Sequence, residues 1–143
     1  MRLLKSEDDG DFSLIEFVDN KIPQYAILSH TWGVDNEVVT FKDIIKGTGK
    51  SKAGYTKIRF CGKQAAKNGL PYFWVDTCCI NKSSSAELTE AINSMFRLYQ
   101  DAAKCYVYLS DVSDSSSVGE DQFSQRWKPA FRKSRWFTRG WTL

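Results

Sequence analysis

Two apolar runs in this chain stop abruptly at small polar residues. The first occupies Tyr25–Ser29 and is followed by His30-Thr31-Trp32-Gly33, and the second occupies Phe73–Asp76 and is followed by Thr77-Cys78. A short apolar run that ends in this way is typical of a buried strand that carries functional groups at its carboxyl end. We therefore predict a strand at each of these two positions.

Small and apolar residues at helical spacing predict two helices. The first is expected over Tyr55–Asn68, with Gly69 as the residue that follows its C-cap. The second is the clearest element of the chain, because six apolar residues form one stripe along it. These residues are Leu88, Ile92, Met95, Phe96, Tyr99 and Ala103.

The order of these elements predicts the fold class. A third strand is expected over Cys105–Leu109, ended by Ser110-Asp111. Strand, helix, strand, helix, strand with short connections indicates an α/β fold with an open parallel sheet and right-handed crossovers. Phe12–Phe17 alternates loosely and fits an edge strand or hairpin arm, while Val38–Ile45 fits either a strand or a helix.

The chain is expected to form one domain. Its 143 residues suit a single core, and 42% hydrophobic and 14% aromatic residues exclude a disordered chain. Within it we distinguish a core over residues 23–112, a serine-rich loop over 113–121 and a basic, aromatic segment over 123–143. No apolar run reaches the roughly 18 residues of a membrane helix, and no secretory signal is evident. We expect a cytoplasmic protein that does not contact a membrane.

Charge and cysteine content exclude other classes. A net charge of +3 makes nucleic acid an improbable partner, although the basic residues of 123–143 are interleaved with aromatic ones. Such a stretch is more often a solvated helix face. The four cysteines lack Cys-x-x-Cys spacing and there is one histidine, so no metal site is expected and the thiols are interpreted as buried. A nucleophilic pair of His30 with Cys78 or Cys79 is possible but has no support in the local sequence.

The predicted strands bring their polar ends together. Because ligands of open parallel sheets bind outside the carboxyl ends of strands, we expect one binding rim there. Its candidate binding residues are Ser29, His30, Thr31, Trp32, Gly33, Asp76 and Thr77. Polar groups beside a tryptophan that can stack on a planar ring suit a nucleotide-sized ligand. Equally open are an Asp76 that forms a turn, a structural His30 and a Trp32 that seals the core.

Three strings of the chain resemble the fungal heterokaryon-incompatibility (HET) domain. They are Tyr25–Gly33, Phe73–Lys82 and Arg135–Leu143, so the resemblance spans nearly the whole chain. It implies an effector of fungal non-self recognition that triggers regulated cell death.

HET domains are thought to be remote relatives of Toll/interleukin-receptor (TIR) domains. Tyr25–Asp35, the Asp76 region and the elements that follow occur in the order of that fold, which implies a flavodoxin-like open sheet. Several TIR domains cleave NAD at the nicotinamide–ribose bond. The resemblance therefore implies NAD as a candidate substrate, no resident cofactor and activation by self-association. Arg135 is a candidate phosphate ligand by its chemistry, although an exposed surface arginine is the simpler interpretation.

The catalytic carboxylate implied by this resemblance is not within the sequence. In HET domains the string Arg139–Leu143 typically continues into Gln-Glu, and that glutamate falls where the TIR catalytic residue lies. The resemblance thus leads us to expect a sheet that lacks its last strands. Glu87 is the substitute candidate, but Ser84-x-x-Glu87 also reads as a capping box, with Ser84 at the N-cap.

A function of another class is compatible with the same residues. The domain could be a non-enzymatic homotypic signalling module whose partner is another copy of itself or an upstream receptor domain. TIR-type folds serve both purposes, so the fold does not choose between them.

Overall fold

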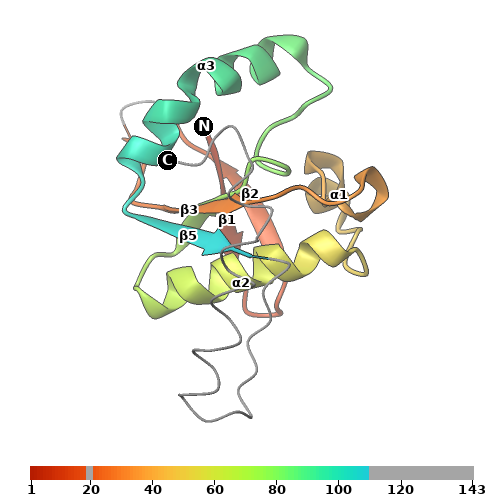
Figure 1. Ribbon diagram of the computed structural model, residues 1–143. Coiled ribbons are helices and arrows are strands. Elements are labelled where there is room, and N and C mark those ends of the chain that lie inside the picture. Colours follow the sequence, from red (N-terminus) through yellow and green to blue (C-terminus); the bar gives the residue numbers. More distant parts are fainter. Residues whose placement is uncertain (19–20, 110–143) are drawn as a thin grey trace, which may run out of the picture.

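A computed structural model describes residues 1–18 and 21–109, which form a five-stranded sheet flanked by helices (Figure 1). The elements in chain order are β1 (Arg2–Ser6), β2 (Phe12–Glu16), β3 (Ala26–His30), the short 3-10 helix η2 (Asp35–Glu37), α1 (Phe41–Lys46), α2 (Ala53–Lys67), β4 (Tyr72–Trp74), α3 (Ser85–Asp101) and β5 (Lys104–Tyr108). The predicted serine-rich loop and the basic, aromatic segment lie outside the described residues.

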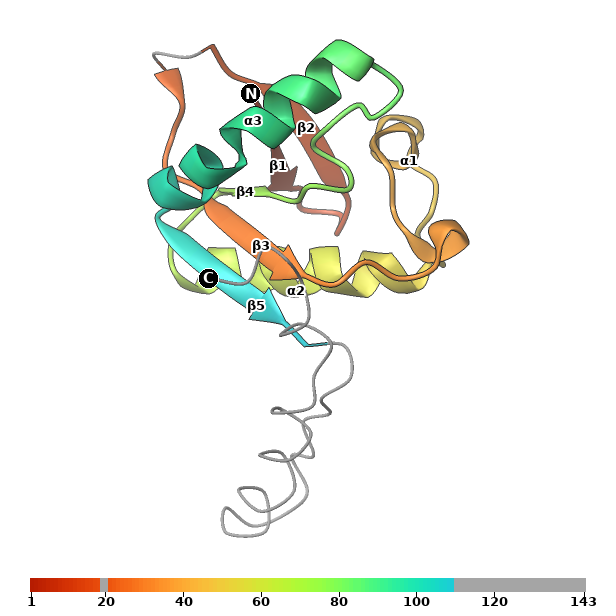
Figure 2. The same cartoon turned by 45° about the horizontal axis from the view of Figure 1, so that its top comes forward.

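The strand order is β2-β1-β4-β3-β5, and β3 pairs in parallel with both β4 and β5. The chain thus passes from β3 to β4 on one side of it, and then crosses over β3 to form β5 on the other side. Crossovers of one hand that run in opposite directions place their helices on opposite faces of a sheet. Figures 1 and 2 show α2 and α3 on opposite faces, and the predicted α/β class is confirmed.

The central strands are parallel as expected, but the sheet as a whole is mixed. β1 pairs antiparallel with both β2 and β4. We did not predict β1, because its only apolar residues are Leu3 and Leu4, too short a run to indicate a strand. Both leucines are fully buried. The interpretation of Phe12–Phe17 as a hairpin arm is confirmed, since β2 is the outer strand of this hairpin.

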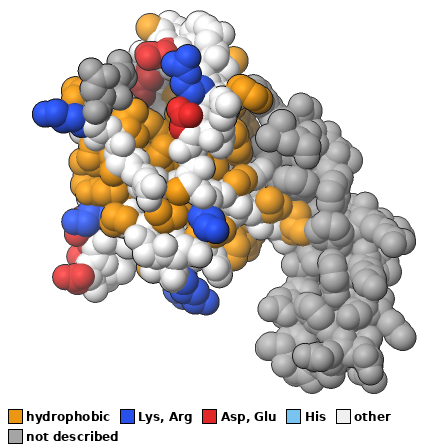
Figure 3. Space-filling view, turned by 90° about the vertical axis from the view of Figure 1, so that its left-hand side faces the viewer, with side chains coloured by type: hydrophobic (Ala, Val, Ile, Leu, Met, Phe, Trp, Pro, Cys, Tyr) orange, Lys and Arg blue, Asp and Glu red, His pale blue; other side chains and the backbone are white. Residues whose placement is uncertain are grey.

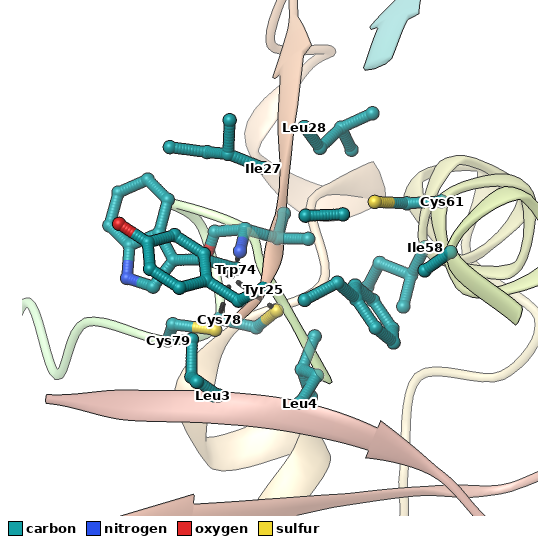
Figure 4. Packing of buried hydrophobic residues seen from close by; sticks show 14 of the residues in the cluster. Leu3, Leu4, Tyr25, Ile27, Leu28, Ile58, Cys61, Trp74, Cys78 and Cys79 are labelled. Carbon is teal, nitrogen blue, oxygen red and sulfur yellow. Dashed lines mark hydrogen bonds between the residues drawn. The ribbon is translucent and has the colours of Figure 1, made fainter. Parts of the chain in front are cut away.

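The hydrophobic core fills both faces of β3. Ile27 points to one face, where it lies near Tyr25 and Trp74, while Leu28 points to the other face, toward Ile58 and Cys61 of α2 (Figure 4). All five residues of β3 are buried. The predicted strand is therefore confirmed, with its bounds one residue further along the chain.

The structure also resolves the helix boundaries. Val38–Ile45, which fitted either element, contributes to α1, whose N-cap Thr40 forms a complete capping box with Asp43. The predicted helix over Tyr55–Asn68 is α2, and Gly69 follows its C-cap with the positive φ of 70° that favours glycine. α3 begins after the predicted N-cap Ser84.

Asp43 fastens α1 to the start of α2. Besides capping α1, its carboxylate accepts a hydrogen bond from Lys52 Nζ at 2.8 Å and one from Thr48 Oγ1 at 3.0 Å. Burial raises the pKa of Asp43, but the hydrogen bonds from Lys52, Thr40 and Thr48 outweigh it and lower the pKa to about 2. The folded protein therefore favours the charged form of this side chain.

We expect Asp43→Ala to lower the free energy of unfolding by about 1–2 kcal/mol at pH 7, since a cap and a charged hydrogen bond are both lost. Because the folded-state pKa is depressed, the contribution of Asp43 is present above about pH 4 and is lost as the pH falls toward 2. Urea unfolding at pH 7 and at low pH measures both effects. The exposed turn residue Asp8 provides the control, Asp8→Ala, and an Asp43→Ala deficit that does not shrink on acidification contradicts the assignment.

Candidate functional site

Side chains from the carboxyl ends of β3 and β4 meet at one edge of the sheet, as predicted. His30 is the last residue of β3, Trp32 lies just beyond it, and Asp76 lies in the turn that follows β4. This turn is closed by Cys79 N–H, which donates to the Val75 carbonyl at 2.9 Å. Parallel pairing of β3 with β4 places these ends side by side.

The carboxylate of Asp76 organises this edge. One oxygen lies 2.8 Å from His30 Nε2, and the other accepts a hydrogen bond from Trp32 Nε1, also at 2.8 Å. Burial by itself raises the pKa of Asp76, but the hydrogen bonds from His30 and Trp32, together with nearby Lys82, lower it. Asp76 is therefore a charged, nearly buried group with both oxygens engaged by the protein.

His30 presents one ring nitrogen without a partner. The residue is 4% exposed, and its Nδ1 has no hydrogen-bond partner within the described part of the chain. Because the Asp76 carboxylate can only accept, Nε2 carries the proton in this contact. Nδ1 is then a polar atom inside the protein without a partner among the described residues, a position that a water molecule or a ligand would satisfy.

Trp32 does not seal the core, because it is 54% exposed. Its indole is held at one edge by Asp76, while the Lys82 ammonium nitrogen lies 3.7 Å from the ring centroid. Burial lowers the pKa of Lys82, and the charge of Asp76 opposes that shift. The site thus offers an aromatic face with a cation next to it.

A small cavity of about 50 Å³ lies behind this edge. His30, Trp32, Gly33 and Thr77 are among its lining residues, together with Lys57 from α2. Its volume corresponds to a few water molecules. A nucleotide-sized ligand is therefore too large to fit inside this cavity.

The remaining candidates occupy several different positions. Ser29 is a buried residue of β3, and the Thr31 carbonyl accepts a hydrogen bond from Lys57 Nζ at 2.5 Å. Arg135, like Ser110 and Asp111, lies outside the described residues. The structure thus brings together His30, Trp32 and Asp76 in direct contact, with Gly33 and Thr77 beside them around the cavity.

Glu87 is engaged away from this cluster. It accepts hydrogen bonds from the Asn81 backbone N–H at 2.9 Å and from the Arg2 guanidinium, while Ser84 Oγ accepts from its own N–H. Burial raises the pKa of Glu87, but these hydrogen bonds outweigh it and lower the pKa. Ser84 is the N-cap as predicted, but the predicted capping box is incomplete, because the Glu87 carboxylate accepts from Asn81 and not from the Ser84 N–H. The contacts of Glu87 instead tie the start of α3 to β1.

The buried thiols do not favour covalent chemistry. Cys78 is fully buried, and burial raises its pKa well above the ordinary value, which disfavours the reactive thiolate. Over residues 1–18 and 21–109, no three histidine, cysteine or acidic side chains are grouped so that they could hold a metal ion. Nor does this part of the chain contain a helix long and apolar enough to cross a membrane.

Lys82 is a site residue that the sequence analysis did not identify. It lies six residues beyond Asp76 and ends the string Phe73–Lys82 quoted above, yet a lone lysine in a polar loop carries no periodic signal. Its proximity to Trp32 depends on the path of the loop between β4 and α3. In the sequence, only the position of this lysine at the end of the string Phe73–Lys82 pointed to a role in the site.

Comparison of the sequence with known proteins identifies one family. Residues 25–130 match the family described as heterokaryon incompatibility protein (HET). The chain is also 58% identical, over 144 residues, to the vegetative incompatibility protein HET-E-1 of Podospora anserina. The chain therefore belongs to the HET family.

These similarities have defined limits. The alignment with HET-E-1 covers 100% of this chain but 10% of that protein. No solved structure gives a significant match, so the relation to TIR domains stays a prediction.

We expect Asp76→Asn to weaken the cluster without abolishing the fold. The amide has one acceptor oxygen and no charge, so it cannot accept from both His30 and Trp32 as the carboxylate does, at a cost of about 1–3 kcal/mol. The indole N–H signal of Trp32 in an NMR spectrum and urea unfolding measure the two effects. Asp101→Asn, at an exposed position of α3, is the control, and an Asp76→Asn variant in which both the Trp32 signal and the free energy of unfolding are unchanged would falsify the arrangement.

Proposed function

We propose that this domain acts in fungal non-self recognition and triggers regulated cell death by cleaving NAD at the nicotinamide–ribose bond when it self-associates. Membership of the HET family and the likeness to a vegetative incompatibility protein support the biological role. The observation that carries the chemical part is the exposed Trp32, fixed by Asp76 and accompanied by Lys82.

This arrangement fits a dinucleotide in two ways. An exposed indole held along one edge is a platform on which a base or nicotinamide ring stacks. Lys82 now lies against that ring, and an arriving aromatic group would replace it there. The displaced ammonium would remain close enough to pair with a phosphate of the same ligand.

The reaction needs a negative charge near the ribose. Cleavage breaks the bond between ribose C1′ and the nicotinamide nitrogen, and the electron pair leaves with nicotinamide. The resulting oxocarbenium-like ribose is stabilised by a carboxylate and captured by water, whose proton passes to a base. The oxygens of Asp76 are already engaged, so we assign it to positioning Trp32. The catalytic carboxylate is expected after Leu143, where the family string continues into Gln-Glu.

Release of nicotinamide from NAD tests the proposal directly. We expect a chain extended through that glutamate to release nicotinamide at high protein concentration, and the 143-residue chain to release little or none. Asp76→Ala in the extended chain should abolish release, because both Trp32 and the buried His30 lose their partner and the whole cluster is disturbed. If neither chain releases nicotinamide even when self-associated, the activity is absent and the non-enzymatic signalling module is the better description.

The binding platform is tested separately from the chemistry. We expect Trp32→Ala to weaken NAD binding by about tenfold to a hundredfold, since stacking on one aromatic side chain contributes roughly 1–3 kcal/mol. Lys82→Met should weaken binding of nicotinamide mononucleotide but not of nicotinamide riboside, which lacks the phosphate. Calorimetric titration measures each affinity. Lys63→Met, at an exposed position of α2, is the control, and equal losses for both ligands in Lys82→Met speak against a phosphate contact.

A further inference from the structure

α3 buries less of its apolar surface than its sequence would lead one to expect. None of its 17 residues is buried, and Ile92 and Phe96 are 50% and 71% exposed. Leu88, Met95 and Tyr99 are partly buried and pack against the core. Ile92 and Phe96 are four residues apart and extend this packed stripe around one flank of the helix. The flank is apolar but uncovered within the described residues.

Helix geometry places that flank toward β5. The crossover from β4 through α3 to β5 takes the usual right-handed form, so α3 runs opposite to the strands. Viewed along the axis from its N-terminus, a right-handed helix rotates clockwise from each residue to the next. On this view Ile92 and Phe96 lie clockwise of the residues that pack on the core, Leu88, Met95 and Tyr99. In a right-handed crossover this is the side on which β5 lies.

The side of β5 that faces α3 carries further exposed apolar residues. Tyr106 and Tyr108 pack on the α2 face: Tyr106 Oη donates to the Gln64 carbonyl at 3.1 Å, and the ring centroids of Tyr108 and Phe60 are 5.2 Å apart. Side chains alternate along a strand, so Cys105 and Val107 face the α3 side. Cys105 is exposed, and Val107 is 40% exposed.

These exposed apolar residues of α3 and β5 form a corner, which we call the α3–β5 corner and define by Ile92, Phe96, Cys105 and Val107. β5 is also the outer strand of the described sheet, with one edge unpaired there. Parallel strands are normally covered on both faces. Figure 3, which views the side where α3 ends and β5 begins, shows hydrophobic side chains gathered on the surface.

We propose that the basic, aromatic segment of this same chain, residues 123–143, covers the α3–β5 corner. The inference does not depend on NAD cleavage. The segment contains six aromatic residues, which are Phe123, Trp127, Phe131, Trp136, Phe137 and Trp141. It contains six basic and no acidic residues, while the exposed charges of α3 are two acids, Glu90 and Asp101, and one cation, Arg97, so the helix is weakly acidic.

The length of the connection permits this docking. Residues 110–122 separate the end of β5 from the segment and span up to about 45 Å when extended. α3, at 17 residues, is roughly 25 Å long, so the chain can return along its full length. A tether of this length also gives the segment an effective concentration in the millimolar range at the corner.

The rate at which a maleimide labels Cys105 in the native 143-residue chain tests whether the segment covers the α3–β5 corner. The other three cysteines are buried, so a maleimide reports mainly on Cys105. We expect labelling at least tenfold slower than for an unstructured thiol peptide, and recovery of fast labelling in the double variant Trp127→Ser, Phe131→Ser. Fast labelling of the unaltered chain overturns the proposal.

Thermal unfolding supplies an independent measurement. Phe96→Ser should lower the melting temperature by several degrees if the corner is covered, because a buried apolar contact is lost. Serine and phenylalanine have similar helix propensities, so the substitution changes helix formation itself very little. Ile45→Ser is the matched control, since Ile45 is a helical residue that is 62% exposed, and it should cause little shift. An unshifted Phe96→Ser contradicts the proposal. Protection of Cys105 that grows with protein concentration, alongside a dimer by sedimentation, overturns it in favour of a second copy of the chain.

Discussion

β3 is the constraint on which the rest of the domain depends. Its five residues are buried, and it is hydrogen-bonded along one edge to β4 and along the other to β5. Because both faces of β3 are also covered with apolar side chains, α2 must lie on one side of the sheet and α3 on the other. The N-terminal hairpin then completes the sheet beyond β4, and Leu3 and Leu4 complete the core.

The same strand determines where the charged group of the site can lie. Asp76 is placed beside the end of β3 by the parallel pairing of β4, so its carboxylate meets His30 and Trp32 at hydrogen-bond distance. A buried carboxylate is tolerated because two donors satisfy it and because Lys82 lies nearby. One charge therefore holds a histidine inside the protein and a tryptophan at its surface. This explains how an exposed indole can have a fixed orientation.

Local patterns in the sequence predicted β3, β4, α2 and α3 because each has a clear period or an abrupt end. The rule for carboxyl ends of parallel strands likewise predicted that His30, Trp32 and Asp76 would meet. It could not predict that both carboxylate oxygens of Asp76 would accept hydrogen bonds from protein donors, since that depends on side-chain direction. β1 was missed because two leucines carry no period, and the bond between Arg2 and Glu87 was missed because it joins residues 85 positions apart.

The position of β3 in the sheet has a consequence for how the chain folds during synthesis. Both neighbours of β3 come later in the sequence: Ala26 pairs with Phe73 on one side and with Lys104 on the other. A ribosome therefore releases an apolar strand well before either partner exists. Contacts so distant in sequence slow folding, and an unpaired apolar strand invites association between chains in the meantime. The nascent domain is thus expected to rely on molecular chaperones until β5 has emerged.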